Sequence, residues 1–180
     1  MSKHTPTRQV ILDIETTGLD PTEGDRIIEI ATVELLDRRV TGNHFHRFLN
    51  PGLAIDPAAQ EVHSITLEFL MDKPQFSNIA QEFIAFIRGA ELVAHNAPFD
   101  VAFLDNELSL LGLDQVEALT SGVIDTLSIA RGKRPGQRNS LDALCEAYQI
   151  NLEGRDLSGA LLDAYLLAEV YLALTTRSLH

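Results

Sequence analysis

The sequence predicts an α/β fold in which a mixed β-sheet is flanked by helices. Three apolar segments before residue 51 are joined by short turns, as in an antiparallel meander. Beyond about residue 77, helical patterns alternate with short apolar segments, which indicates further strands connected by helices. The chain has 180 residues, 45% of them hydrophobic, enough for one domain with a real core. We therefore expect a single domain over residues 1–180 built on a five-stranded sheet, with three antiparallel strands followed by parallel ones.

The three antiparallel strands are expected at residues 9–15, 26–36 and 43–50. The first, "QVILDIE", is apolar and is followed by "TTGLDPTEGD", a loop rich in Gly, Pro and Asp. The second, "RIIEIATVELL", is separated from the third by "DRRVTG", which predicts a turn.

A helix is expected next, over residues 78–88, because apolar residues recur there every four positions. Ser77 is a favoured residue type for its N-cap, and Gly89 is expected to end it. Residues 91–95, "ELVAH", predict a short strand.

Three further helices complete the expected fold. Pro98 suits the first turn of a helix that runs to Leu111. Ser140 is expected to cap a short helix, and the last helix is expected to start near Gly159. The final five or so residues are expected to be frayed.

Composition and charge narrow the class of protein. Fourteen basic and 26 acidic residues give a net charge of −12, which argues against a stand-alone nucleic-acid binder and is compatible with carboxylates that hold divalent cations. No apolar stretch is long enough to span a bilayer, and the N-terminus lacks the apolar segment of a signal peptide. Cys145 is the only cysteine, so no internal disulfide forms, and we expect a cytoplasmic protein.

Four acids stand in unusually apolar surroundings, and each has a simpler explanation. Asp13 and Glu15 share one face of a strand, where they would repel each other unless a cation neutralises them or the strand end meets solvent. Asp100 lies in a first helical turn, where the helix dipole alone favours an anion. Asp163 lies among leucines, unless it occupies the exposed side of its helix.

Taken together, these acids predict a metal site. Hard oxygen ligands from separate elements suit Mg²⁺ or Mn²⁺ rather than a thiophilic metal. Two such ions about 3.5–4 Å apart form the clamp used for in-line phosphodiester cleavage. We therefore expect Asp100 to be a ligand first and a helix cap second.

The motifs "DIETTG", "HNAPFD" and "NSLDALC" followed by "GALLDA" resemble the proofreading 3′–5′ exonuclease domain of the epsilon subunit of bacterial DNA polymerase III. This domain belongs to the histidine branch of the DEDD exonuclease superfamily. The resemblance covers nearly the whole chain and implies an RNase H-like fold, two divalent cations, and removal of nucleotides from single-stranded 3′ DNA ends during replication. The metal ligands that it implies are Asp13, Glu15, Asp100 and Asp163.

The resemblance also implies a site for the 3′-terminal nucleotide. The backbone and hydroxyl groups of Thr16, Thr17 and Gly18 are expected to hold it, and the base pocket is expected to be lined by Leu19, Val62, His63 and Phe99. For Leu19, Val62 and Phe99, ordinary core packing is the alternative.

The third motif departs from the family pattern, which is a histidine, four residues and then an aspartate. Here the segment reads "SGALLD", so Ser158 takes the place of the histidine that accepts a proton from the attacking water. A serine hydroxyl does not titrate near neutral pH, and the expected loss is that of a general base, roughly 10²–10⁴-fold. Ser158 is also a favoured N-cap type, so its hydroxyl is alternatively expected to accept a hydrogen bond from the first turn of the last helix.

No other histidine is expected to serve as the base. His63 and His95 are expected near the site, and His44 and His46 are expected at the surface of a strand.

Two alternatives to a DNA exonuclease remain. Ser158 is compatible with a structural subunit that steadies a polymerase and cleaves little, and the same motifs occur in RNA-trimming relatives. The resemblance implies a polymerase catalytic subunit as partner, bound mostly through a C-terminal tail that we expect to be absent here. A small theta-type subunit binds this domain in some relatives. We expect no membrane partner and a monomeric domain.

Overall fold

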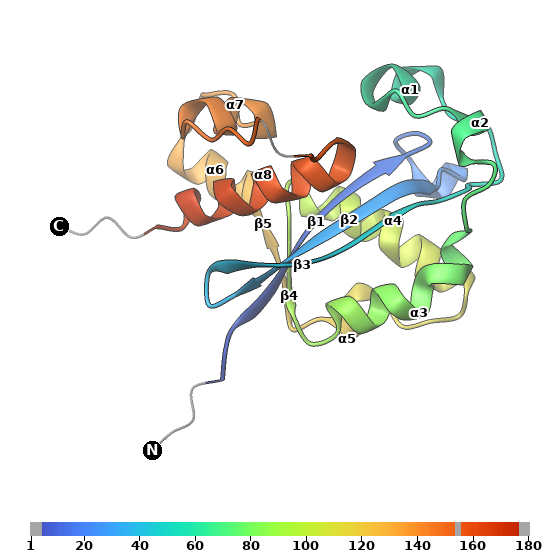
Figure 1. Cartoon of the computed structure of the whole chain (residues 1–180), viewed down its shortest axis with the longest axis horizontal. Helices are drawn as coiled ribbons and strands as arrows, with labels where there is room; N and C mark the ends of the chain where they lie inside the picture. The colour runs from blue at the N-terminus through green and yellow to red at the C-terminus, as the bar shows by residue number, and fades with distance from the viewer. Residues whose placement is uncertain (1–4, 154–155, 177–180) are drawn as a thin grey trace.

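The computed structural model describes residues 5–153 and 156–176, and it contains one five-stranded sheet in the order β3-β2-β1-β4-β5 (Figure 1). The strands are β1 (Arg8–Thr16), β2 (Ile27–Leu36), β3 (Arg39–Phe48), β4 (Glu91–Ala94) and β5 (Gly122–Asp125). The first three are antiparallel, while β4 runs parallel to β1 and β5 parallel to β4. The predicted mixed sheet is therefore confirmed.

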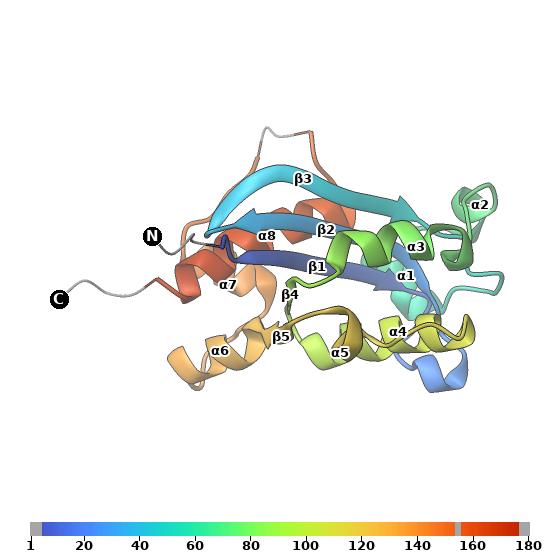
Figure 2. The ribbon, with the colours of Figure 1, turned by 90° about the horizontal axis from the view of Figure 1, so that it is seen from below.

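Helices cover both faces of this sheet (Figure 2). They are α1 (Pro57–His63), α2 (Leu67–Leu70), α3 (Phe76–Ile87), α4 (Ala97–Leu110), α5 (Val116–Leu119), α6 (Thr126–Lys133), α7 (Leu141–Ala147) and α8 (Gly159–Leu174), with a short 3₁₀ helix, η1 (Pro21–Glu23), after β1. One face packs against α3 and α4, and the other packs against α8 with α6 and α7. Among the described residues, no helix is both long enough and apolar enough to cross a membrane.

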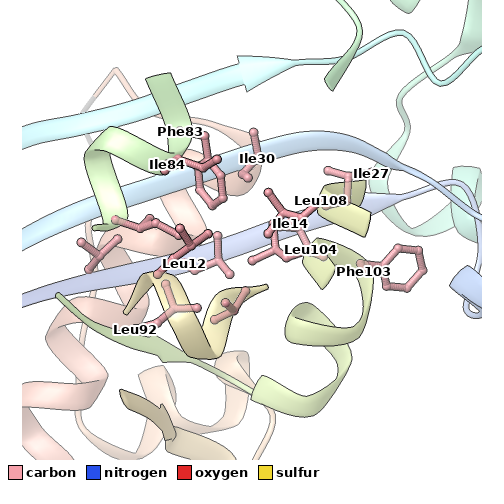
Figure 3. Packing of buried hydrophobic residues seen from close by; sticks show 14 of the residues in the cluster. Leu12, Ile14, Ile27, Ile30, Phe83, Ile84, Leu92, Phe103, Leu104 and Leu108 are labelled. Atoms are coloured by element: carbon pink, nitrogen blue, oxygen red, sulfur yellow. The ribbon is translucent and has the colours of Figure 1, made fainter. Parts of the chain in front are cut away.

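Apolar side chains alternate along β1 so that each face contributes to one of the two cores. Leu12 and Ile14 point toward α3 and α4, where Phe83 and Leu104 are fully buried (Figure 3). Ile11 points to the opposite face and packs in the cluster that includes α8. This packing fixes the C-terminal end of β1, and therefore the positions of its acids.

Several expected boundaries were wrong for identifiable reasons. The β2–β3 turn is only Asp37 and Arg38, both with positive φ (45° and 66°), so β3 starts at Arg39 rather than at residue 43. Ser77 does not cap α3, because Gln75 forms a capping box with Asn78 one turn on. Helices α1, α2, α5 and α6 were not predicted.

The ends of the remaining helices agree with the sequence. Helix α4 contains Pro98 in its first turn, and the hydroxyl of Ser140 accepts from the Ala143 N–H (3.1 Å) as an N-cap. Helix α8 begins at Gly159. The segment expected to be frayed lies mostly outside the described residues, although the Thr176 hydroxyl donates to the Leu172 carbonyl (2.6 Å).

Candidate active site

Three of the four expected carboxylates meet at the C-terminal end of β1. Asp13, Glu15 and Asp163 each present an oxygen, and these oxygens all lie within 4.8 Å of one another. Asp13 and Glu15 come from one strand face, and Asp163 comes from the second turn of α8, which packs against β1 and β2. Residues that are 148 positions apart in sequence, such as Glu15 and Asp163, therefore form one cluster.

Asp100 lies next to this cluster, in the first turn of α4. It is 6% exposed, and its charge raises the pKa of Asp13. It is not the cap of its helix, because Asp125 Oδ1 accepts from the N–H groups of Asn96 (2.9 Å) and Ala97 (3.2 Å). Asp125 thus accepts the hydrogen bonds at the start of α4, and Asp100 is close enough to the cluster for the charge of Glu15 to raise its pKa.

A fifth acid, Glu29, belongs to the same region and was missed by the sequence analysis. It lies opposite Glu15 in the β1–β2 pairing and is 1% exposed. An acid inside the apolar run "RIIEIATVELL" was the available signal, but the sequence does not define the pairing register that places it beside Glu15.

The pKa values of the four expected ligands are all raised, because these acids are buried and lie close to one another. Burial is the largest cause of the raised pKa of Asp13, followed by the charges of Asp163, Asp100, Glu15 and Glu29. Burial and the charge of Glu29 raise the pKa of Glu15 from 4.5 to about 7. The pKa values of Asp100 and Asp163 are also raised, again mainly by burial.

These pKa values predict how the stability of the metal-free protein depends on pH. Below pH 4.5, Glu15 is protonated in both the folded and the unfolded chain, so it does not change the free energy of unfolding. As the pH rises toward about 7, the unfolded chain releases a proton that the folded chain retains, so the free energy of unfolding falls. We expect a lower melting temperature near pH 8 than near pH 5 in a chelator, and recovery near pH 8 on adding Mn²⁺.

The matched control for this melting experiment is Glu15→Gln, which removes the titrating group. This variant should lose less stability between the two pH values than the unmodified chain. An equal loss in both proteins would contradict the role assigned to Glu15.

The donor set fits divalent cations. Asp13 Oδ2 is buried and has no hydrogen-bond partner among the described residues, an arrangement that costs free energy unless a ligand completes it. Carboxylate oxygens are the ligands that Mg²⁺ and Mn²⁺ prefer, and bound positive charge offsets the repulsion among the acids.

A cavity of about 300 Å³ opens beside Glu15. Of the expected nucleotide-site residues, it is lined by Thr16, Gly18, Leu19, Val62, His63 and Phe99. Leu19 and Val62 are each 83% exposed, which excludes core packing for both side chains. Phe99 packs partly against the core and also lines the cavity.

Thr17 and Gly18 support this cavity from the loop after β1. Thr17 is fully buried; its hydroxyl donates to Asp25 (2.9 Å) and accepts from the Arg26 N–H (3.0 Å), so the structure does not bring it to the cavity. A Cβ at Gly18 would lie 2.3 Å from Asp25 Oδ2, so any larger residue would displace the Asp25 carboxylate from its bond with Thr17.

Ser158 occupies the N-cap position of α8, but its side chain makes no capping hydrogen bond. The expectation that its hydroxyl caps the helix is therefore wrong. Glu29 Oε1 instead accepts from the Ala160 N–H (3.1 Å) and thereby caps α8 from the neighbouring strand. Ser158 is exposed, and nothing in its chemistry supplies a proton acceptor near neutral pH.

Glu29 fixes the start of α8 through a close approach to Gly159. Gly159 has φ of +60°, and a Cβ there would lie 2.9 Å from Glu29 Oε1. The same carboxylate oxygen lies 2.8 Å from His46 Nε2, so His46, expected at the surface, instead pairs with a buried acid. Because Asp163 follows Gly159 by about one turn, the bond from Glu29 helps to position a carboxylate that is expected to be a ligand.

We expect Glu29→Ala to weaken Mn²⁺ binding by about 10–100-fold, the usual effect of removing a group that orients a ligand. Glu29→Gln keeps an oxygen that can accept from Ala160 and His46, and it should retain most of the affinity. Calorimetric titration of both variants tests this role. Equal losses in the two variants would contradict it and would indicate that only the charge of Glu29 matters.

The other expected histidines are already engaged. His63 Nε2 donates to the Thr16 carbonyl (3.1 Å) while Nδ1 accepts from the Ile65 N–H (3.0 Å), and burial lowers its pKa. His95 donates from Nε2 to the Asn139 carbonyl (2.7 Å), and burial lowers its pKa as well. Both ring nitrogens of each histidine therefore lie within hydrogen-bond distance of a protein atom.

Comparison with known proteins agrees with this geometry. Residues 10–171 match the exonuclease family. The chain is 55% identical over 174 residues to the DNA polymerase III subunit epsilon of Escherichia coli (strain K12), covering 94% of this chain and 72% of that protein. It is 52% identical over 169 residues to the same subunit of Rickettsia typhi (strain ATCC VR-144 / Wilmington), covering 93% and 74%.

Solved structures show the same fold. Exonuclease X in complex with 5′ overhanging duplex DNA superposes with a TM-score of 0.73 at 28% identity, covering 92% of this chain and 90% of that chain. The nuclease domain of 3′hExo, a DEDDh family member bound to rAMP, gives a TM-score of 0.76 at 17% identity, covering 96% and 94%.

The RNase H-like sheet and the carboxylate cluster at the end of β1 define a metal-dependent 3′–5′ exonuclease. Within that class, the chain belongs to the family of DNA polymerase III epsilon subunits, the proofreading exonucleases.

Proposed function

We propose that the chain removes nucleotides from single-stranded 3′ DNA ends with Mg²⁺ or Mn²⁺, and that its chemical step is slow because Ser158 stands where the family has a histidine. The observation that carries the proposal is the convergence of Asp13, Glu15 and Asp163 beside a cavity that suits one terminal nucleotide. The DNA named with Exonuclease X supports the substrate class.

The proposed roles follow from position. Asp13, Glu15, Asp100 and Asp163 hold the cations, and Leu19, Val62 and Phe99 present apolar surface to the terminal base. His63, a neutral histidine tied to the Thr16 carbonyl, keeps the rim of the cavity in place. Two bound cations supply water activation and charge stabilisation for in-line hydrolysis.

The proton of the attacking water has no protein acceptor at position 158. The rate should therefore depend on hydroxide or on an added base. We expect slow release of mononucleotides from a 3′ end, with a rate that rises steeply with pH and is increased by imidazole. A neutral-pH optimum with no effect of imidazole would contradict a missing base.

The replacement of a titratable histidine by Ser158 also favours a second candidate, a structural subunit that steadies a polymerase and cleaves little. Absence of cleavage under all these conditions, with Mn²⁺ bound, would favour this role. A parallel assay with RNA ends separates a DNA exonuclease from an RNA-trimming enzyme, because only RNA carries a 2′-hydroxyl.

Partners and location follow from the relatives. Their name, DNA polymerase III subunit epsilon, supports association with a polymerase and a cytoplasmic location. We propose a domain that is monomeric alone and leave a theta-type subunit as a partner to be tested by co-purification.

A further inference from the structure

A concentrated basic segment lies in this acidic protein and has no part in the site described so far. Residues 126–141 contain Arg131, Lys133, Arg134 and Arg138 and no acid, whereas the whole chain has a net charge of −12. Among the described residues, none of these four cations forms an ion pair. We refer to residues 126–141 as the basic segment.

The basic segment forms one side of a cavity of about 590 Å³ between α6 and α7. Its lining includes Arg131, Arg134, Gln137, Asn139 and His95. This volume lies within the usual range of ligand sites, and the guanidinium group of Arg131 is suited to binding phosphate. Arg138 is not part of the lining but directly precedes Asn139, which is.

Hydrogen bonds hold the segment in a defined shape. The Arg134 guanidinium donates to the Arg138 carbonyl (2.9 Å), to Asn139 Oδ1 (3.1 Å) and to Gln137 Oε1 (3.0 Å). The Asn139 carbonyl accepts from His95 (2.7 Å), which joins the segment to the end of β4. Arg134 therefore organises the loop, and Arg131 and Arg138 present exposed side chains without such bonds.

The cavity and the carboxylates lie at the same end of the sheet, where the parallel strands β1 and β4 reach their C-termini. Leu12 of β1 pairs with Ala94 of β4, so Asp13 and His95 lie at the same level. Asp142, two residues after Ser140 of the cavity lining, is close enough to raise the pKa of Asp163. The basic cavity and the carboxylate cluster are therefore neighbours.

The two cavities are lined by different helices. The smaller one is lined by residues of α1 and α4, and the basic one lies between α6 and α7. Along the horizontal axis of Figures 1 and 2, the start of α8 lies between α1 and the α6–α7 pair. With a terminal nucleotide in the smaller cavity and its linkage at the carboxylates, the rest of the strand can continue toward the α6–α7 side.

We propose that the basic segment binds the sugar–phosphate backbone of the single strand on the 5′ side of the linkage that is cut. This rests on the proposed function, because it requires a strand whose 3′ end lies at the carboxylates. Arg131 and Arg138 contact phosphates, and this contact gives an acidic protein a local attraction for its polyanionic substrate.

The test compares Arg131→Gln/Arg138→Gln with a matched control, Arg39→Gln/Arg88→Gln. Arg39 and Arg88 are exposed. They lie at the opposite end of the sheet, beside the N-terminal ends of β1 and β4. Binding is measured by fluorescence anisotropy with hexathymidylate that carries a 3′-terminal phosphorothioate, in Mg²⁺ over a range of salt concentrations. Binding of thymidine 5′-monophosphate is measured by calorimetry.

We expect the Arg131→Gln/Arg138→Gln variant to bind the hexanucleotide about tenfold more weakly. The slope of log affinity against log salt should fall by about 1.4, since each phosphate contact on a single strand contributes about 0.7. Mononucleotide affinity should not change, and the control variant should resemble the unmodified chain.

Unchanged hexanucleotide affinity and slope, or an equal loss in the control, would overturn the proposal. If the unmodified chain still binds the mononucleotide and trims 3′ ends, only the role of the basic segment fails. If it binds neither ligand and trims nothing, the proposed function fails with it.

Discussion

Ser158→His should increase the rate of 3′-end cleavage by about 10²–10⁴-fold, the usual contribution of a general base. The exposed position of Ser158 at the start of α8 leaves room for the larger side chain, and its own hydroxyl makes no capping bond that the change would remove. The rate of the variant should rise through the titration of a histidine near pH 6.5 and then level off. Single-turnover cleavage of a 3′-labelled strand over a range of pH measures both features.

The control for this experiment is Ser158→Ala. Because the hydroxyl neither caps the helix nor accepts the proton, alanine should leave both the cleavage rate and the melting temperature nearly unchanged. A loss of activity in Ser158→Ala comparable to the expected gain in Ser158→His would show that the serine itself takes part in the chemistry. No gain with histidine, while Mn²⁺ still binds, would favour the structural subunit.

Asp13→Asn should abolish most of the activity that Ser158→His restores, and should therefore be made in that background. A bound cation contributes several kcal/mol to the stabilisation of the transition state, so losing a ligand is expected to cost about 10³-fold in rate. Single-turnover cleavage again provides the measurement. Retained activity would exclude Asp13 as a ligand.

The same substitution should have the opposite effect on the stability of the metal-free protein. Asp13 is a buried acid whose pKa is raised by burial and by four neighbouring acids. Removing its charge should stabilise the metal-free fold near pH 8 by at least about 1 kcal/mol, or roughly 2–4 °C in melting temperature. With saturating Mn²⁺ the order should reverse, because only the unmodified chain gains stability from binding. Thermal melts with chelator and with Mn²⁺ would reveal this crossing.

Much of the fold could be predicted because its elements carry strong local patterns. The apolar run of β1, the Pro98 start of α4 and the Ser140 cap of α7 all depend on residues within one turn or strand. The extent of β3 was wrong because two residues with positive φ make a tighter turn than the glycine further on suggested. Short helices such as α2 and α5 have too few turns to show a period.

The residues of the candidate site were likewise predictable only where a local pattern or motif identifies them. Alternation along a strand places Asp13 and Glu15 on one face, and the motifs identify Asp100 and Asp163. Glu29 could not be placed, since its role depends on the pairing of β1 with β2 across a loop. The cap that it gives to α8 depends on the packing of that helix against both strands.

The central claim is that the chain keeps a two-cation site although Ser158 replaces the base. Calorimetric titration of the unmodified chain with Mn²⁺ tests this claim most directly. We predict two cations bound for each chain, with binding lost or greatly weakened in Asp13→Asn. A folded, unmodified chain that takes up no Mn²⁺ would contradict the account.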